Sequence, residues 1–200
     1  MARLGGIERW FMTRSKHGRC TMERAEKLLS LIDRRGGERF LEVGCGAGAV
    51  SKYMAEEFEL DVTAVDIDPD MLRRAKEGAD EALRIHLLAA DATTLPFKDD
   101  CFDLVLSFGV MHHIRNWTHA MEEIVRVLRS NGHIIFWDIV YSDPGAKIIR
   151  PMAGSFGVPT MPEIRSFFRD SGLRTIHSER LRRTFPGQYE AVLVLDMPGK

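Results

Sequence analysis

The stretch FLEVGCGAG, residues 40–48, is the sequence feature that most constrains the fold. An apolar run at residues 39–43 predicts a buried strand, and the spacing of apolar side chains over residues 50–58 predicts a helix. Three glycines separated by single residues join the two. A strand that turns through glycines into a helix is typical of sheets that bind a nucleotide or another adenosine-containing cofactor at the turn.

Strands and helices alternate through the rest of the chain. Further strands are predicted at residues 61–66, 84–91, 101–110 and 133–140, and helices at residues 21–35, 69–79, 117–130 and 161–172. This alternation predicts a mostly parallel sheet with helices on both faces. The last two strand-like runs, at residues 173–181 and 189–197, are joined by so short a connection that they must be antiparallel.

Composition indicates the class of protein. A chain of 200 residues that is 44% hydrophobic can bury one core, so we expect a single domain over residues 1–200. Residues 1–20 are a candidate cap and residues 141–160, rich in Gly and Pro, a candidate partial lid. A net charge of -1 gives no overall attraction to nucleic acid, and no apolar run is long enough to span a membrane.

The three cysteines are Cys20, Cys45 and Cys101, a scattered and odd set. Their spacing fits neither a disulfide framework nor a zinc site, so we expect reduced thiols, no metal and a cytoplasmic protein. The composition does not define the oligomeric state.

The glycine spacing alone leaves the cofactor open. Gly44, Gly46 and Ala49 fit the G-x-G-x-x-G/A pattern of dinucleotide-binding proteins, and Asp66 lies where an acid that binds the ribose of NAD would be expected. A nicotinamide-dependent oxidoreductase is therefore one hypothesis at this point.

Nearby acidic residues favour another cofactor. Glu42 lies two residues before the first glycine, where its charge would repel a pyrophosphate and attract an ammonium or sulfonium group. The third glycine, Gly48, lets the backbone approach a compact ligand. Asp66 and Asp91 end neighbouring strands and could accept hydrogen bonds from sugar hydroxyls and from an adenine amino group. A cationic adenosine cofactor fits these residues best.

Four motifs in this order resemble the class I S-adenosylmethionine-dependent methyltransferases, and within them the small-molecule group that includes the ubiquinone and menaquinone methyltransferases. The motifs are FLEVGCGAG, AVDIDPDML, AADATTLPFKDDCFDLVLSFGVMHHI and SNGHIIFWDIV, and they extend from about Gly37 to about Tyr141. The resemblance implies a Rossmann-like, seven-stranded sheet whose last strand is antiparallel.

The resemblance also implies roles for single residues. Gly44, Gly46 and Gly48 would approach the methionine part of S-adenosylmethionine, Glu42 its amino group and Asp66 the ribose. The remaining predicted contacts are those of Ile67, Asp91 and Ala92 with adenine, and of Ser107 with the region of the sulfonium.

Acceptor residues are harder to predict. His112 and His113 follow the fourth strand, and a histidine can accept a proton near neutral pH. We expect mainly packing and helix-start hydrogen bonds from them; of the two, His113 is the candidate to face the acceptor. Asp138, at the end of the fifth strand, either caps a loop or acts on the acceptor. His113 and Asp138 are therefore the catalytic candidates.

A small metabolite with an oxygen or carbon nucleophile is the expected acceptor. The fourth strand ends in SFGV and lacks the Asn/Asp-Pro-Pro-Tyr/Phe motif of enzymes that methylate DNA amines. The charge balance also disfavours nucleic acid. RNA or protein acceptors and a non-catalytic S-adenosylmethionine-binding protein are retained as alternatives.

Overall fold

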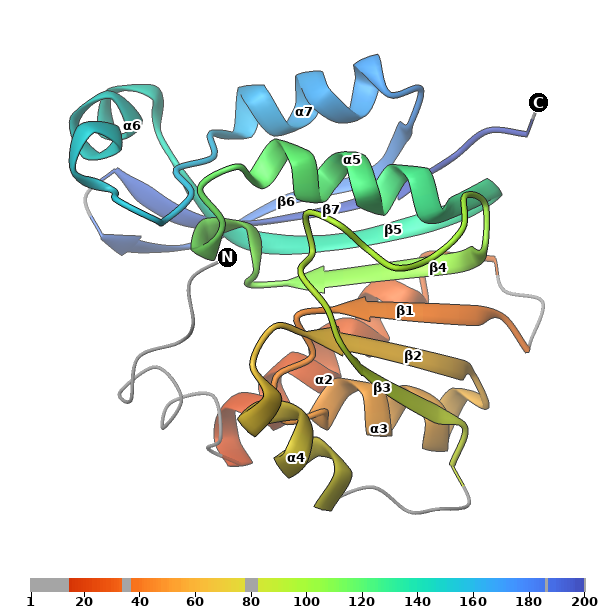
Figure 1. The fold of residues 1–200 in the computed structure, drawn as a ribbon. Helices are drawn as coiled ribbons and strands as arrows, with labels where there is room; N and C mark the ends of the chain where they lie inside the picture. The colour runs from red at the N-terminus through yellow and green to blue at the C-terminus, as the bar shows by residue number, and fades with distance from the viewer. Residues whose placement is uncertain (1–14, 34–36, 78–82, 186, 200) are drawn as a thin grey trace.

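The computed structural model describes residues 15–33, 37–77, 83–185 and 187–199, which form one seven-stranded sheet with helices on both faces (Figure 1). The first 14 residues of the predicted cap at residues 1–20 lie outside the described residues. No helix among the described residues is long and apolar enough to cross a bilayer.

The strands follow the order β3-β2-β1-β4-β5-β7-β6 across the sheet. Neighbouring strands from β3 to β5 are parallel, whereas β7 is antiparallel to both β5 and β6. The predicted fold class is therefore confirmed. The strands are β1 (Arg39–Val43), β2 (Asp61–Asp66), β3 (Ile85–Ala89), β4 (Phe102–Phe108), β5 (Leu128–Tyr141), β6 (Arg174–Phe185) and β7 (Gln188–Asp196).

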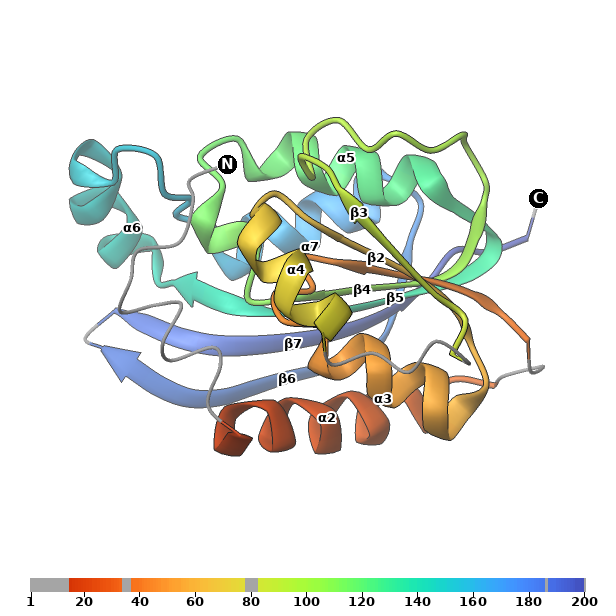
Figure 2. The ribbon, with the colours of Figure 1, turned by 60° about the horizontal axis from the view of Figure 1, so that its bottom comes forward.

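Two helical layers cover the sheet (Figure 2). Side chains of α5 and α7 form an apolar cluster on one face, and those of α2 and α3 form a second cluster on the other. The helices are α2 (Ser15–Leu29), α3 (Ala49–Phe58), α4 (Pro69–Glu77), α5 (Trp117–Val127), α6 (Asp143–Ile149) and α7 (Met161–Asp170), with the 3-10 helices η1 (Met111–His113) and η2 (Arg150–Met152).

The predicted bounds of two helices were wrong: the helix predicted at residues 117–130 differs at its end, and the one predicted at residues 21–35 differs at both ends, since it is Ser15–Leu29. The helix predicted at residues 117–130 ends at Val127, because Leu128 adopts an extended backbone and pairs with Phe102 of β4. Asn131, expected to end that helix, instead donates its backbone N–H to the carbonyl that follows β7. The first helix begins at Ser15, before the predicted start at residue 21. Strand pairing overrides local helix propensity at the first of these sites.

Residues 141–160 contain helical structure that the sequence did not predict. Ser142 caps α6 by accepting the N–H of Gly145, and η2 follows. Thr160 then begins α7 in a capping box with Glu163, in which each side chain bonds to the other residue's backbone N–H. Residues 141–160 follow the carboxyl end of β5 and lie at the edge of the sheet where β1, β4 and β5 end (Figure 1).

Candidate active site

The three glycines after β1 form a turn held against β2 and against the segment that follows β4. Gly44, Gly46 and Gly48 all have left-handed backbones, with φ of 76°, 54° and 76°. The N–H groups of Gly44 and Cys45 both donate to the carbonyl of Val65. A Cβ on Gly44 would lie 2.4 Å from Val110 Cγ2, so only glycine fits there.

Asp66 ties the glycine turn to the end of β2. Its Oδ2 accepts the N–H of Gly46 at 2.8 Å, and its Oδ1 accepts the N–H of Asp68 at 2.8 Å. The side chain is buried, and burial raises the pKa of the carboxyl above its usual value. Its backbone carbonyl also accepts the N–H of Ala90, which joins the ends of β2 and β3.

Glu42 is a buried carboxyl on β1, beneath the glycine turn. It is 4% exposed, and the hydroxyl of Ser51 on α3 donates a hydrogen bond to it. Burial raises the pKa of Glu42 from its ordinary value of 4.5 to about 7, and the charge of Asp66 adds to this shift. A nearby cation would favour the ionised form of Glu42, whereas a pyrophosphate would oppose it.

Asp91 lies just beyond β3, directly before a turn. Its Oδ1 accepts the backbone N–H of Thr93 at 2.9 Å and the Thr93 hydroxyl at 2.8 Å. Partial burial acts to raise the pKa of Asp91, the hydrogen bonds from Thr93 are among the causes that lower it, and the net shift is downward. Ala92 follows, 2% exposed, and Ile67 is half-buried beyond the end of β2.

Ser107 occupies the centre of this edge. It pairs with Val43 of β1 on one side and with Phe136 of β5 on the other, and it is fully buried. Its hydroxyl has no hydrogen-bond partner within the part of the chain that the structure describes. A buried polar atom without a partner is uncommon, and a bound ligand or water would supply one.

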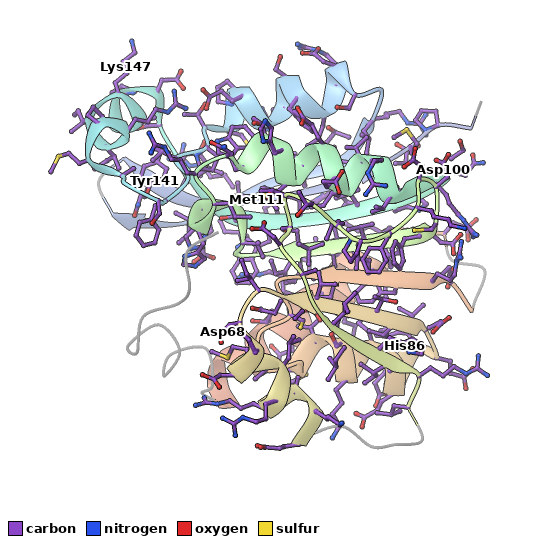
Figure 3. The ribbon with its side chains drawn as sticks, viewed as in Figure 1. Asp68, His86, Asp100, Met111, Tyr141 and Lys147 are labelled. Carbon is purple, nitrogen blue, oxygen red and sulfur yellow. The ribbon has the colours of Figure 1, made fainter. Side chains whose placement is uncertain are left out.

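Asp138 organises the other half of the site, around η1. It is 1% exposed, and its Oδ2 accepts the N–H of Val110 at 2.9 Å and of Met111 at 2.7 Å. Its Oδ1 accepts the N–H of Ile139 at 2.7 Å. Of the two alternatives that the sequence left open for Asp138, these contacts support the loop cap. Figure 3 shows Met111 at this edge of the sheet, across the site from Asp68 near α4.

His112 is the functional candidate that the sequence prediction did not select. Its Nδ1 lies 2.6 Å from Asp138 Oδ1, and its side chain is 19% exposed. The His113 ring stacks on His112 with centroids 3.9 Å apart and lies 5.9 Å from the Phe156 ring. Because Asp138 is 26 residues beyond His112, only the pairing of β4 with β5 reveals the contact.

The segment of residues 141–160 is fixed to η1 at its far end. The N–H of Gly157 donates to the carbonyl of His112 at 3.0 Å. A Cβ on Gly157 would lie 2.3 Å from the Met111 carbonyl oxygen and 2.5 Å from that of Ile114. The close approach of two backbones therefore requires glycine, and the segment forms a wall beside the two histidines.

A pocket of about 370 Å³ opens between this segment and the loops that follow β3 and η1, and none of the predicted cofactor residues lines it. Its size falls within the range typical of small-molecule sites. The lining residues come from the loop after β3, the connection between η1 and α5, and the wall segment, and they are Thr93, Ile114, Arg115, Asn116, Gly154 and Ser155. Among the described residues, no group of three His, Cys, Asp or Glu side chains is placed to hold a metal ion.

Comparison with known proteins agrees with this geometry. Residues 41–136 match the family described as a methyltransferase domain. A 27-O-demethylrifamycin SV methyltransferase from Amycolatopsis mediterranei is 30% identical over 80% of this chain and 62% of its own length. An O-methyltransferase from Aspergillus nomiae is 26% identical over 83% of this chain and 76% of its own length.

A solved structure shares the fold at lower identity. A phosphoethanolamine N-methyltransferase from Haemonchus contortus, in complex with phosphomonomethylethanolamine and S-adenosylhomocysteine, aligns with a TM-score of 0.70. It is 17% identical, and the match covers 86% of this chain and 52% of that one.

Residues 41–136 thus match a methyltransferase domain, and the relatives and the shared fold support the class I, S-adenosylmethionine-dependent type. Of its relatives, one is named as a methyltransferase of a demethylrifamycin and another as an O-methyltransferase. The chain spans less than two-thirds of the first of these relatives, at 62% of its length.

Proposed function

We propose that this protein transfers a methyl group from S-adenosylmethionine to an oxygen or carbon nucleophile of a small-molecule acceptor. The observation that carries the proposal is the placement of two carboxyl groups against one glycine turn, with a third just beyond the end of β3. Glu42 is buried beneath the turn, and Asp66 accepts the N–H of Gly46 within the turn. Asp91 lies just beyond the end of β3, which is separated from β1 by β2. Such a set suits a ligand with a cationic end and sugar hydroxyls.

Each part of the cofactor has a proposed partner. The turn of Gly44, Gly46 and Gly48 would approach the methionine portion, with Glu42 toward its amino group. Asp66 would accept from the ribose hydroxyls with the lone pairs that its two amide hydrogen bonds leave. Ile67, Asp91 and Ala92 would contact adenine, and Ser107, whose buried hydroxyl has no partner among the described residues, would lie beside the sulfonium region.

The cofactor, when bound, supplies a methyl group already activated by its positive sulfur. The chain has to orient the acceptor and exclude water, and positioning of this kind is worth roughly 7–11 kcal/mol. The β4–β5 ends and the wall of residues 141–160 supply those surfaces. His113 and Asp138 remain the sequence-based candidates for acting on the acceptor.

The named acceptors of the relatives support a small molecule here. One relative acts on a rifamycin, as its name states, and another is named an O-methyltransferase. The pocket beside residues 154–155 has a volume suited to such a ligand. A cytoplasmic location, a single domain with a cap and a lid, and the absence of a DNA substrate stay predictions.

Calorimetric titration of the purified chain with S-adenosylmethionine and, separately, with NADH tests the cofactor. We expect binding of the sulfonium compound and none of NADH; the reverse result would reject the proposal. Turnover is then measured with methyl-tritiated cofactor against phenols, polyketide alcohols, tRNA and total protein. Label in the RNA or protein fraction alone would reject a small-molecule acceptor, and binding without any transfer would indicate a non-catalytic cofactor-binding protein.

A further inference from the structure

We propose that His112 is the general base that accepts the proton of an acceptor hydroxyl, and that Asp138 positions it. This inference rests on the proposed function and goes further, because it assigns the proton to one atom, His112 Nε2, and selects hydroxyl-bearing acceptors. It also places the base on the neighbour of His113, the residue that the sequence favoured.

The contact between the two side chains determines the tautomer. Asp138 Oδ1 lies 2.6 Å from His112 Nδ1 and is one of two oxygens that already accept backbone N–H groups. Carboxyl oxygens that already accept amide protons also accept from the imidazole and do not donate to it. The neutral ring must therefore carry its proton on Nδ1, which leaves Nε2 bare on the far side of the ring.

The surroundings hold this ring in place. Asp138 is 1% exposed, whereas the His112 side chain is 19% exposed, so the carboxylate is sealed and the ring can still be reached. The His112 carbonyl accepts from Gly157 of the wall segment, and the His113 ring packs on the imidazole. A base fixed by a buried carboxylate on one nitrogen and open at the other is suited to proton transfer.

The pair also lies next to the proposed cofactor site. Asp138 Oδ2 holds the N–H of Val110, and Val110 packs so closely on the glycine turn that no side chain fits at Gly44. The same carboxylate thus positions the imidazole and Val110, which touches the turn. His112 follows Val110 by two residues. An acceptor between the imidazole and the glycine turn could therefore reach both His112 and the bound cofactor.

The proton step balances as follows. As the acceptor oxygen bonds to the methyl carbon, the carbon–sulfur bond breaks and its electron pair stays on sulfur. The hydroxyl proton passes to His112 Nε2, and the resulting imidazolium is stabilised by the Asp138 carboxylate 2.6 Å away. A general base of this kind contributes about 10²–10⁴-fold to rate.

The first test needs no acceptor. Long-range proton–nitrogen NMR spectra of the full chain, with and without S-adenosylhomocysteine, report which ring nitrogen of each neutral histidine carries the proton. The His112 signal is assigned by its loss in His112→Asn. We expect a protonated Nδ1 and a bare Nε2; a protonated Nε2 in the neutral ring would overturn the proposal. Asp138→Asn should shift His112 toward the other tautomer, whereas a purely structural Asp138 would leave the tautomer unchanged.

The second test uses the acceptor alcohols or phenols that the labelled-cofactor screen identifies. His112→Asn keeps an N–H donor near the position of Nδ1 for Asp138 but has no atom at Nε2. We expect kcat to fall by about 10²–10⁴-fold while the Kd for S-adenosylhomocysteine and the thermal unfolding temperature stay unchanged. His119→Asn, at an exposed position of α5, is the matched control and should leave kcat unchanged.

The two proposals fail in different ways. Wild-type kcat in His112→Asn would overturn the role of His112 and leave the methyltransferase function intact. Failure of the wild-type chain to bind the cofactor would reject the proposed function, whatever the tautomer. If the screen yields no hydroxyl acceptor, the NMR result alone decides whether His112 presents a bare Nε2.

Discussion

The two halves of the candidate site are built in different ways. On the cofactor half, the residues are contiguous or end adjacent strands: the Asp66 carboxylate bonds to Gly46 and to Asp68, two residues along. On the acceptor half, Asp138 reaches back 26 to 28 residues to the amides of η1. The cofactor half is therefore built mainly by contacts at the turn and at adjacent strand ends. The acceptor half is built by contacts that form only when β4 pairs with β5.

This difference predicts where stability and where binding should respond to mutation. In the acceptor half, the single buried carboxylate of Asp138 accepts several backbone N–H groups. Removal of this carboxylate should therefore destabilise η1 and the wall segment that packs on it. The cofactor half spreads its contacts over a turn and three strand ends, so single changes there should weaken ligand binding more than they weaken the fold.

The largest effect is expected for Asp138→Ala. The buried N–H groups of Val110 and Met111 would lose their acceptor, and each such loss costs about 1–3 kcal/mol. We expect the free energy of unfolding to fall by about 3–5 kcal/mol, measured by urea denaturation.

Asp170→Ala is the control for this prediction. Asp170 is exposed and its ion pair with Arg169 lies at the surface, so we expect its loss to change stability by less than about 0.5 kcal/mol. Equal effects of the two variants would contradict the importance of the buried carboxylate.

The next effect concerns Glu42 on the cofactor half. Because burial raises its pKa from 4.5 to about 7, the folded protein holds a proton that the unfolded chain loses between these values. The associated stability is present below pH 4.5 and is lost as the pH rises through 7. From pH 5 to 8 the wild type should therefore lose about 2–3 kcal/mol relative to Glu42→Gln.

Urea unfolding of both proteins at pH 5, 6.5 and 8 measures this difference. The glutamine keeps an oxygen that can accept from Ser51 but carries no charge. Saturating S-adenosylmethionine should reduce the loss at high pH, since a cation favours the ionised carboxyl. Parallel pH curves for the two proteins would show that Glu42 titrates as it does in the unfolded chain.

A smaller effect is expected for Gly157→Ala on the acceptor half. The new Cβ would meet the carbonyl oxygens of Met111 and Ile114 at 2.3 and 2.5 Å, so the backbones must separate. Overpacking of this kind costs about 1–3 kcal/mol, measured by thermal unfolding. Ser155→Ala, at an exposed neighbouring position, is the control. Gly157→Ala with wild-type stability would show that the wall segment moves freely from η1.

The same contrast explains what the sequence could predict. The positions of the glycine turn and of Asp66 and Asp91 beside strand ends were predicted because strand ends and turn residues carry local signals, and the hairpin of β6 and β7 followed from its short connection. The helix-to-strand change at Leu128, the helix α6 and the contact between His112 and Asp138 were missed. Each depends on partners brought together by the sheet, such as Phe102 for Leu128, and no local spacing encodes such a partner.

The smallest predicted effect, Asp66→Ala, tests the cofactor half most directly. The loss of a charged acceptor for the ribose should weaken S-adenosylmethionine binding by about 1–2 kcal/mol, roughly tenfold, measured by calorimetry. Asp66 also accepts the Gly46 amide, so thermal unfolding must accompany the titration.

Asp68→Ala is the matched control: Asp68 Oδ1 accepts the N–H of Asp70 at the start of α4, so its loss should lower stability with little change in affinity. Unchanged affinity in Asp66→Ala, or equal losses of affinity in both variants, would mean that the ribose lies elsewhere. Loss of affinity in Asp66→Ala alone would show that the strand end, and not the helix start that follows it, recognises the ligand.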